Sequence, residues 1–194
     1  MDTHDFEHLI LSAGMMAGFD RPWAVTGGWA LDVWVGRLTR PHRGIRIAVL
    51  RDDQIVLRDY AFGWKFWIRA MDGRLVPWKT TNRQMLMLPV YQLRASNRWG
   101  HVLEFVLEES DGREWVYRYN SGVRMSLSSW IGLPRLGLPV VNPSAILLEK
   151  SRSNSPKDEL DIRSVVGTLD ESRRTWLKLA LMRCEPHHPW LDIL

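Results

Sequence analysis

A pair of glycines between two apolar stretches limits what this chain can fold into more than any other feature of its sequence. The stretch Trp23-Ala-Val-Thr-Gly-Gly-Trp-Ala-Leu-Asp32 predicts a short strand at 24–25, a turn at Gly27 and Gly28, and a helix over 29–35. Apolar residues that alternate over 45–49 then predict a second strand. A strand, a glycine turn, a helix and a further strand together indicate an α/β unit.

The rest of the sequence predicts further strands and, towards the C-terminus, helices. Apolar positions at helical spacing predict a helix over 5–18, and another is expected over 52–60. The dipeptide Asp72-Gly73 is typical of a hairpin turn, here between strands over 64–69 and 75–78. Further strands are expected over 85–93, 101–108 and 114–119, and helices over 144–151, 157–167 and 171–183.

These elements divide the chain into three parts. Residues 1–120 form the α/β domain, and residues 121–143, which are rich in Gly, Pro and Ser, are expected to form a linker loop. Residues 144–194 form a C-terminal helical segment that packs on the α/β domain. We therefore predict an α/β (α+β) protein with a helical tail.

Composition and charge exclude several classes of protein. The 26 basic residues are balanced by 22 acidic ones and no run of five like charges occurs, so no nucleic-acid partner is expected. The N-terminus lacks a secretory signal, and no apolar run approaches the ~20 residues that cross a bilayer, so no membrane partner is expected. The single Cys184 excludes an internal disulfide and fits a reducing compartment. We therefore expect a cytoplasmic protein.

Several motifs, in order along almost the whole chain, are similar to those of known enzymes. Gly27-Gly-Trp-Ala-Leu-Asp32 is followed by Gly36-Arg-Leu-Thr-Arg-Pro-His42, and later by Trp115-Val-Tyr-Arg118, Leu147-Leu-Glu-Lys150 and Lys157-Asp-Glu-Leu-Asp161. Their order and spacing resemble the aminoglycoside 2″-adenylyltransferase-like and lincosamide nucleotidyltransferase-like proteins. The resemblance implies a nucleotidyltransferase-like mixed sheet flanked by helices, with a C-terminal helical segment.

The resemblance also implies what each part of the site does. The glycine turn lets the backbone approach a triphosphate, an acidic pair on the next strand binds Mg²⁺, and a third carboxylate acts as general base. Here Glu104 matches the third carboxylate, but Gly44 and Arg46 stand in place of the acidic pair, and Tyr119 replaces a second arginine after Arg118. Because Gly44 has no side chain and Arg46 is a permanent cation, we expect a degenerate member without metal ligands.

The matching positions predict catalytic and ligand-binding residues. Two pairings stay open: Arg46 and Glu104 form a functional pair or a structural salt bridge, and Lys157 pairs with Asp161 or borders the pocket. The predicted catalytic residues are Glu104, Arg46 and His42. The predicted ligand-binding residues are Thr26, Gly27, Gly28, Trp29, Asp32, Arg40, Arg118, Lys150 and Lys157.

The main functional hypothesis is a reused scaffold. A nucleotidyltransferase fold that lost its metal site binds a small organic molecule and transforms it without metal or cofactor, as a cyclase, lyase or isomerase in biosynthesis. Arg46 would anchor an anion or carbonyl, and Glu104 would move a proton. Whether the chain is an enzyme stays open, but such chemistry is favoured over adenylyl transfer.

Two alternatives remain. One is a residual nucleotidyltransferase that uses ATP and Mg²⁺ to modify a hydroxyl of an aminoglycoside- or lincosamide-like molecule. The other is a non-catalytic binding module of an antitoxin-like or regulatory kind. The expected ligand is a small molecule, while a homodimer or a protein partner stays open.

Overall fold

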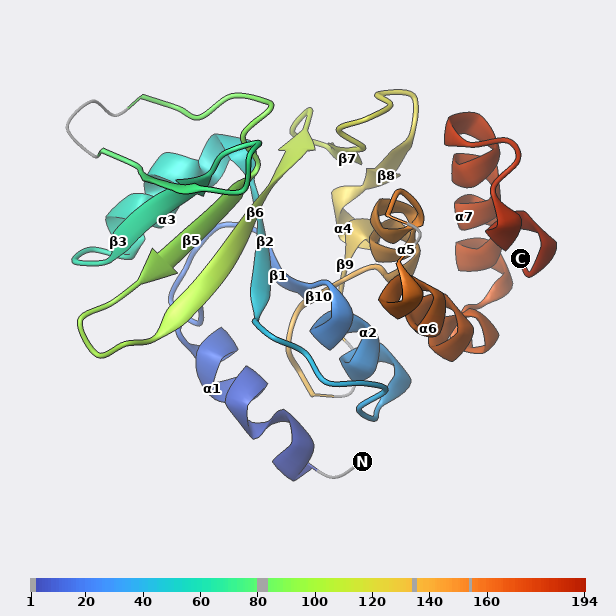
Figure 1. The fold of residues 1–194 in the computed structure, drawn as a ribbon, viewed down its shortest axis with the longest axis horizontal. Coiled ribbons are helices and arrows are strands. Elements are labelled where there is room, and N and C mark those ends of the chain that lie inside the picture. The colour runs from blue at the N-terminus through green and yellow to red at the C-terminus, as the bar shows by residue number, and fades with distance from the viewer. Residues whose placement is uncertain (1–2, 80–83, 134–135, 154) are drawn as a thin grey trace.

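A mixed sheet forms the centre of the protein, and helices flank it (Figure 1). The computed structural model describes residues 3–79, 84–133, 136–153 and 155–194. Within these residues the strands are β1 (Trp23–Thr26), β2 (Arg46–Leu50), β3 (Lys65–Arg69), β4 (Leu75–Pro77), β5 (Gln92–Ser96), β6 (Val102–Ser110), β7 (Glu114–Val116), β8 (Arg124–Ser126), β9 (Ile131–Gly132) and β10 (Val140–Val141). The α-helices are α1 (Glu7–Gly14), α2 (Gly28–Val35), α3 (Gln54–Tyr60), α4 (Leu127–Trp130), α5 (Pro143–Ser151), α6 (Pro156–Val165) and α7 (Glu171–Cys184). Single 3₁₀ turns cover Thr3–Phe6, Arg51–Asp53, Val166–Thr168 and Pro189–Asp192.

The sheet combines parallel and antiparallel pairs. Its strand order is β4-β3-β5-β6-β2-β1-β10-β9, and β7 pairs with β6 and β8. The pairs β2/β6 and β1/β10 are parallel, and the other pairs are antiparallel. The predicted α/β (α+β) class, with a mixed sheet flanked by helices, is confirmed.

Strand β2 lies between β1 and β6, and its sequence explains this place. Ile47, Ala48 and Val49 are fully buried, so both faces of the strand are covered. An apolar run of this kind suits a strand inside a sheet rather than at its edge. Arg46, the first residue of β2, is exposed instead, which leaves its side chain at the end of the strand.

The strand predicted over 85–93 is wrong in position, because β5 begins only at Gln92. The backbone before β5 is held by a side chain rather than by a neighbouring strand. Arg51 donates hydrogen bonds to the carbonyl oxygens of Leu86 and Val90, at 2.9 and 2.8 Å. Carbonyl groups that accept these bonds are already satisfied and do not need a strand partner.

Residues 121–143, expected to be a linker loop, contain the short elements β8, α4, β9 and β10. β10 pairs with β1 at Val25 and Val140, and β8 pairs with β7. These strands are two or three residues long, which is too short for sequence periodicity to reveal them. Pairing with longer strands stabilises them instead. The division of the chain into domains stays a prediction.

The C-terminal helices begin at polar caps and lie beside the sheet (Figure 1). The side chains of Asn142, Ser155 and Asp170 accept hydrogen bonds from backbone N–H groups in the first turns of α5, α6 and α7. Helix α2 packs against both α5 and α6, and so joins the helical segment to the sheet. Among the helices described, none has the length and apolar character needed to span a bilayer.

Candidate functional site

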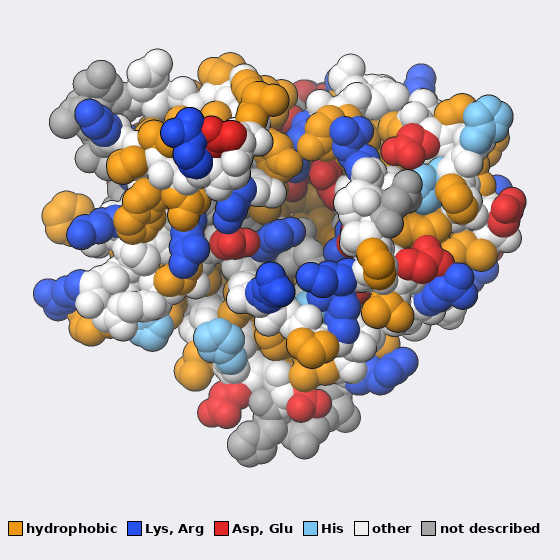
Figure 2. Space-filling view, viewed as in Figure 1, with side chains coloured by type: hydrophobic (Ala, Val, Ile, Leu, Met, Phe, Trp, Pro, Cys, Tyr) orange, Lys and Arg blue, Asp and Glu red, His pale blue; other side chains and the backbone are white. Residues whose placement is uncertain are grey.

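An open cleft of about 710 Å³ lies between the sheet and helices α5 and α6. Figure 2 shows it as a hollow near the centre of this face, with Lys and Arg side chains along its edge. Its walls come from the β1–α2 turn, the segment before β2, strand β6, the chain after β7, the end of α5 and the start of α6. Folding therefore brings side chains from distant parts of the sequence into one cavity.

The turn between β1 and α2 needs glycine at two positions, for different reasons. Gly27 has a φ of 73°, which lies in the left-handed region that favours glycine. A Cβ atom on Gly28 would lie 2.3 Å from the His42 ring, so any side chain there would clash. The turn brings the N-terminal N–H groups of α2 to the cleft, where the helix dipole favours an anion.

Arg46 and Glu104 lie opposite each other on the parallel strands β2 and β6. The Nε atom of Arg46 is 3.2 Å from a Glu104 carboxylate oxygen, and a guanidinium nitrogen of Arg69 is 3.6 Å from the other oxygen. One carboxylate thus faces two guanidinium groups, which leaves this part of the cleft positively charged. The salt bridge that the sequence left open is present, and a functional role for the pair stays a prediction.

A buried pair, Asp32 and His42, lies behind the glycine turn. The Nε2 atom of His42 is 2.5 Å from one Asp32 oxygen, and the Thr39 hydroxyl donates to the other oxygen at 2.5 Å. Arg40 donates to Nδ1 of His42 at 3.0 Å, and since arginine only donates, Nε2 must carry the ring proton. Both ring nitrogens therefore have protein partners, which suits a residue that positions its neighbours.

The same network continues to helices α5 and α6. Arg40 donates two hydrogen bonds of 2.8 Å to the carboxylate of Asp161, and these raise the pKa of Arg40. Lys150 lies 2.7 Å from both Asp158 and Asp161. Burial opposes the charge on Asp158, but hydrogen bonds from Lys150 and two serines outweigh it and lower the Asp158 pKa. These four residues tie the segment before β2 to both helices.

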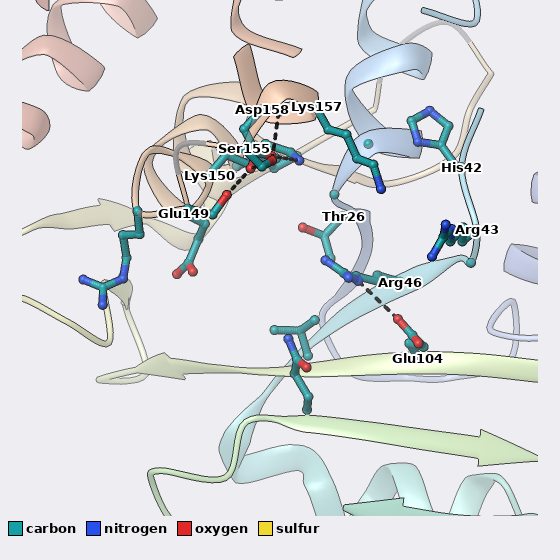
Figure 3. A pocket seen from close by; sticks show the side chains of 18 of the residues that line it. Thr26, His42, Arg43, Arg46, Glu104, Glu149, Lys150, Ser155, Lys157 and Asp158 are labelled. Atoms are coloured by element: carbon teal, nitrogen blue, oxygen red, sulfur yellow. Dashed lines mark hydrogen bonds and ion pairs between the residues drawn. The ribbon is translucent and has the colours of Figure 1, made fainter. Parts of the chain in front are cut away.

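Two cations on the cleft wall, Arg43 and Lys157, take no part in such ion pairs among the described residues. No hydrogen bond or ion pair joins the side chain of Arg43 or Lys157 to any residue that the structure describes. Lys157 does not pair with Asp161 and instead extends from the start of α6 towards Thr26 (Figure 3). Arg43 and Arg46 lie on the facing wall (Figure 3). The second of the two options for Lys157, that it borders the pocket, fits this position.

A further group of charges lies where the chain after β7 meets α5. Arg118 is 2.7 Å from Glu108 and 3.5 Å from Glu149, and it packs 4.3 Å above the Tyr91 ring. Burial opposes its charge, but the two carboxylates raise the Arg118 pKa. Burial also raises the pKa of Glu149 to about 7, and its Oε1 atom has no hydrogen-bond partner within the described chain. Glu149 can therefore exchange a proton near neutral pH.

Tyr119 stands where the family pattern has a second arginine. The guanidinium group of Arg152, which follows the last turn of α5, stacks on the Tyr119 ring at 3.7 Å. This contact is a cation–π interaction, and it brings a positive charge to the wall from a different element. Both residues line the cleft. A tertiary contact thus supplies a cation at a place where the local sequence has none.

Most of the predicted site residues line this one cavity. Trp29 and Asp32 do not: Trp29 packs on the His42 ring, with 5.0 Å between ring centroids, and Asp32 is bonded to the same ring. The catalytic and binding roles of all these residues stay predictions. The predicted residues on the wall are Thr26, Gly27, Gly28, Arg40, His42, Arg46, Glu104, Arg118, Lys150 and Lys157.

Several wall residues were missed as site residues by the sequence prediction. Arg43, Tyr119 and Glu149 had a usable signal, because each is next to a predicted residue within or beside a motif. The others had none, since only the tertiary fold brings them to the cleft. The missed residues include Arg43, Tyr91, Tyr119, Glu149 and Arg152.

Comparison with known proteins adds to this geometry. Residues 11–83 match the aminoglycoside-2″-adenylyltransferase family. The family resemblance expected from the motifs is therefore confirmed. A search of curated proteins found no match to the sequence.

Solved structures of adenylyltransferases share the fold. The lincomycin-bound lincosamide antibiotic adenylyltransferase LnuA is 15% identical with a TM-score of 0.54, over 84% of this chain and 97% of that chain. ANT(2″)-Ia in complex with adenylyl-2″-tobramycin is 16% identical with a TM-score of 0.57, over 91% of this chain and 97% of that chain. The solution structure of the antibiotic-resistance factor ANT(2″)-Ia is also 16% identical, with a TM-score of 0.55 over 96% of this chain and 95% of that chain. At these identities the likeness shows a nucleotidyltransferase fold.

Proposed function

We propose that the protein binds a nucleoside triphosphate in the cleft and transfers its nucleotidyl group to a hydroxyl of a small molecule. The observation that carries this proposal is the Gly27–Gly28 turn, which opens into a cation-lined cleft within an adenylyltransferase fold. Backbone N–H groups at the start of α2 and the side chains of Arg46 and Lys157 would contact the phosphates. Of the functions that the sequence left open, this one is nearest to the residual nucleotidyltransferase, for which both ATP and Mg²⁺ were expected.

The family implies a divalent metal ion here, but the residues at the expected place do not fit one. Gly44 offers no side chain, Arg46 is a cation, and Glu104 already faces two guanidinium groups. In the described part of the chain, no group of three or more His, Cys, Asp or Glu side chains could hold a metal ion. Mg²⁺ needs several oxygen ligands, and this set of residues does not offer them.

Glu149 is the carboxylate best suited to take the proton of the acceptor hydroxyl. It lines the cleft, its pKa is raised to about 7, and Figure 3 shows it across the cleft from the Arg46–Glu104 pair. The hydroxyl oxygen attacks the α-phosphorus, and the bond to the bridging oxygen of the β-phosphate breaks. The proton passes to Glu149 and pyrophosphate leaves. Glu104 is less suited, because its two carboxylate oxygens already face Arg46 at 3.2 Å and Arg69 at 3.6 Å.

A second candidate is the reused cleft, and the Arg46–Glu104 ion pair favours it. Arg46 replaces an expected carboxylate by a cation and binds the remaining carboxylate at 3.2 Å. A small molecule with a carbonyl or carboxylate would be polarised by Arg46, while Glu104 exchanges a proton. No nucleotide takes part in this chemistry.

Nucleotide binding and label transfer separate the two candidates. ATP in excess should raise the melting temperature by several degrees, since a ligand at about 100 times its Kd stabilises the native state by about 2.7 kcal/mol. With ATP labelled at the α-phosphate, label should move to an acceptor such as lincomycin or tobramycin as pyrophosphate is released. Lys157→Ala should weaken ATP binding, whereas Lys178→Ala, an exposed lysine outside the cleft, should not.

The opposite results decide against nucleotidyl transfer. Millimolar ATP that leaves the melting temperature unchanged, with and without Mg²⁺, would contradict the proposal. A melting-temperature rise with small carboxylates, lost in Arg46→Gln, would instead support the reused cleft. A stable protein complex without any small-molecule binding would support the binding-module hypothesis.

A further inference from the structure

We infer that Arg43, Arg46 and Lys157 form a polyphosphate-binding site that works without a divalent metal ion. The inference rests on the proposed function, because it concerns the same cleft, but it makes a separate claim about how the phosphates are held. It begins with the charges of the cleft wall. Several are held in buried ion pairs, whereas Arg43 and Lys157 have no hydrogen bond or ion pair with any described residue, and Arg46 has an exposed pair with Glu104.

Three other cations of the cleft wall are held in buried ion pairs. Arg40 is bound through two hydrogen bonds to Asp161, Lys150 lies between Asp158 and Asp161, and Arg118 is paired with Glu108. Breaking such a buried pair is strongly destabilising, because it leaves an unpaired charge in a buried place. Arg40, Lys150 and Arg118 are therefore unsuited to hold an exchangeable ligand.

The remaining cations surround the glycine turn. Arg46 pairs in register with Thr26 on β1, and its Cδ atom would lie 3.7 Å from a Cβ atom built on Gly27. Lys157 extends towards Thr26 from the other wall, and Arg43 lies on the same wall as Arg46 (Figure 3). An anion in front of the turn would thus meet backbone N–H groups and side-chain cations together.

Arg46 can leave Glu104 at little cost. Its side chain is 51% exposed, and exposed ion pairs contribute about 0–1 kcal/mol. Arg69, from strand β3, is 3.6 Å from the other oxygen of Glu104, so this contact does not depend on Arg46. The carboxylate therefore keeps one partner, while Arg46 is free to form a bidentate contact with a phosphate group.

Permanent cations here perform the charge neutralisation that a metal ion would otherwise perform. A triphosphate carries several negative charges, and three side-chain cations beside the helix N-terminus offset most of them. The same cations repel Mg²⁺, so metal and site compete for the phosphates. The expected ligand is therefore a free polyphosphate, as an inorganic ion or as part of a nucleotide, rather than its magnesium complex.

Calorimetric titration with two probes tests this site. ATP and inorganic tripolyphosphate are each titrated into the full chain, once in EDTA and once with excess Mg²⁺. We expect both to bind in EDTA, and binding to weaken when Mg²⁺ is added. Arg46→Gln and Arg43→Gln should each weaken binding roughly 10- to 100-fold, since each removes a charged hydrogen bond. Arg113→Gln, which changes an exposed arginine outside the cleft, is the matched control and should bind as the wild type does.

A rebuilt acidic pair provides a second test. A Cβ atom on Gly44 would meet only the Glu104 carboxyl carbon, at 3.9 Å, so a side chain fits there. The double variant Gly44→Asp, Arg46→Asp places three carboxylates together, and it should bind ATP only when Mg²⁺ is present. An unchanged melting temperature in the absence of ligand shows that the variant is folded.

Each outcome has a defined meaning. Binding of both probes only with Mg²⁺ overturns the inference and leaves the proposed function standing. Tripolyphosphate binding in EDTA without ATP binding supports the inference and contradicts the proposed function. Failure of both probes in both buffers overturns both claims. Metal-independent binding by the double variant, at wild-type strength, also overturns the inference.

Discussion

The helix wall and the sheet wall of the cleft hold their paired charges in different ways. On the helix wall, Asp161 is 1% exposed and its partners Arg40 and Lys150 are 15% and 14% exposed. On the sheet wall, Arg46 is 51% exposed and shares one carboxylate with Arg69. The buried network joins elements far apart in sequence, so it stabilises the fold. The exposed set contributes little to stability, and it is therefore free to bind a ligand.

The largest effect should come from breaking the helix wall. Asp161→Ala leaves Arg40 and Lys150 without their shared partner in a buried place, which should lower the free energy of unfolding by about 3–5 kcal/mol. Thermal unfolding should then begin about 10 °C lower. Asp72→Ala, which removes an exposed partner of Arg74, is the control and should change little. If Asp161→Ala lowers the free energy of unfolding by less than about 1 kcal/mol, the charges of the two walls do not differ in their contribution to stability.

An intermediate effect should come from Glu149, which is half-buried and whose Oε1 atom lacks the hydrogen bonds that Asp158 receives. Its pKa rises from 4.5 to about 7 on folding, so between these values the folded state holds a proton that the unfolded state releases. The stability of the wild type should therefore fall as pH rises through this window.

Glu149→Gln removes this titration. Between pH 5 and pH 8, the free energy of unfolding of the wild type should fall by about 1–3 kcal/mol more than that of the variant. Urea unfolding at four pH values across that range measures the difference. Parallel pH profiles for the two proteins would show that Glu149 titrates normally and would remove the argument for it as a proton acceptor.

The smallest effect should come from the sheet wall. Arg46→Gln removes one of two cations from an exposed carboxylate, so the free energy of unfolding should change by less than about 1 kcal/mol. Urea unfolding without ligand provides the measurement, and Arg113→Gln provides the reference. A loss above about 2 kcal/mol would make Arg46 part of the structural network, and so contradict its role as a ligand-binding cation.

Much of the fold could be predicted from local sequence. The Gly27–Gly28 turn, helix α2 and strand β2 are predicted by the glycine pair between apolar stretches and by apolar alternation, and all three are present. The segment 85–93 shows where this reasoning fails. Its composition resembles a strand, but Arg51 binds two of its carbonyl groups, and no periodicity encodes a contact between residues that far apart.

The candidate site divides in the same way. The positions of Gly44, Arg46 and Glu104 could be compared with a motif, because each lies on or next to a strand with a clear pattern. Two options were open for Lys157: it pairs with Asp161, or it borders the pocket. In the structure Asp161 pairs with Arg40. Helical spacing permits the Lys157–Asp161 contact. Burial favours the Arg40–Asp161 contact, because a bidentate pair shielded from water is stronger than an exposed one.

The sequence by itself determined the local chemistry of this protein: a glycine turn before a helix, a cation where a metal ligand is expected, and apolar strands that must be buried. Only the tertiary structure decided which charges are paired and which remain free. Pairing depends on distances between segments that are remote in the chain, as between Arg40 and Asp161, and on exclusion from water. Neither quantity is encoded at any single position, so the difference between the two walls of the cleft arises only on folding.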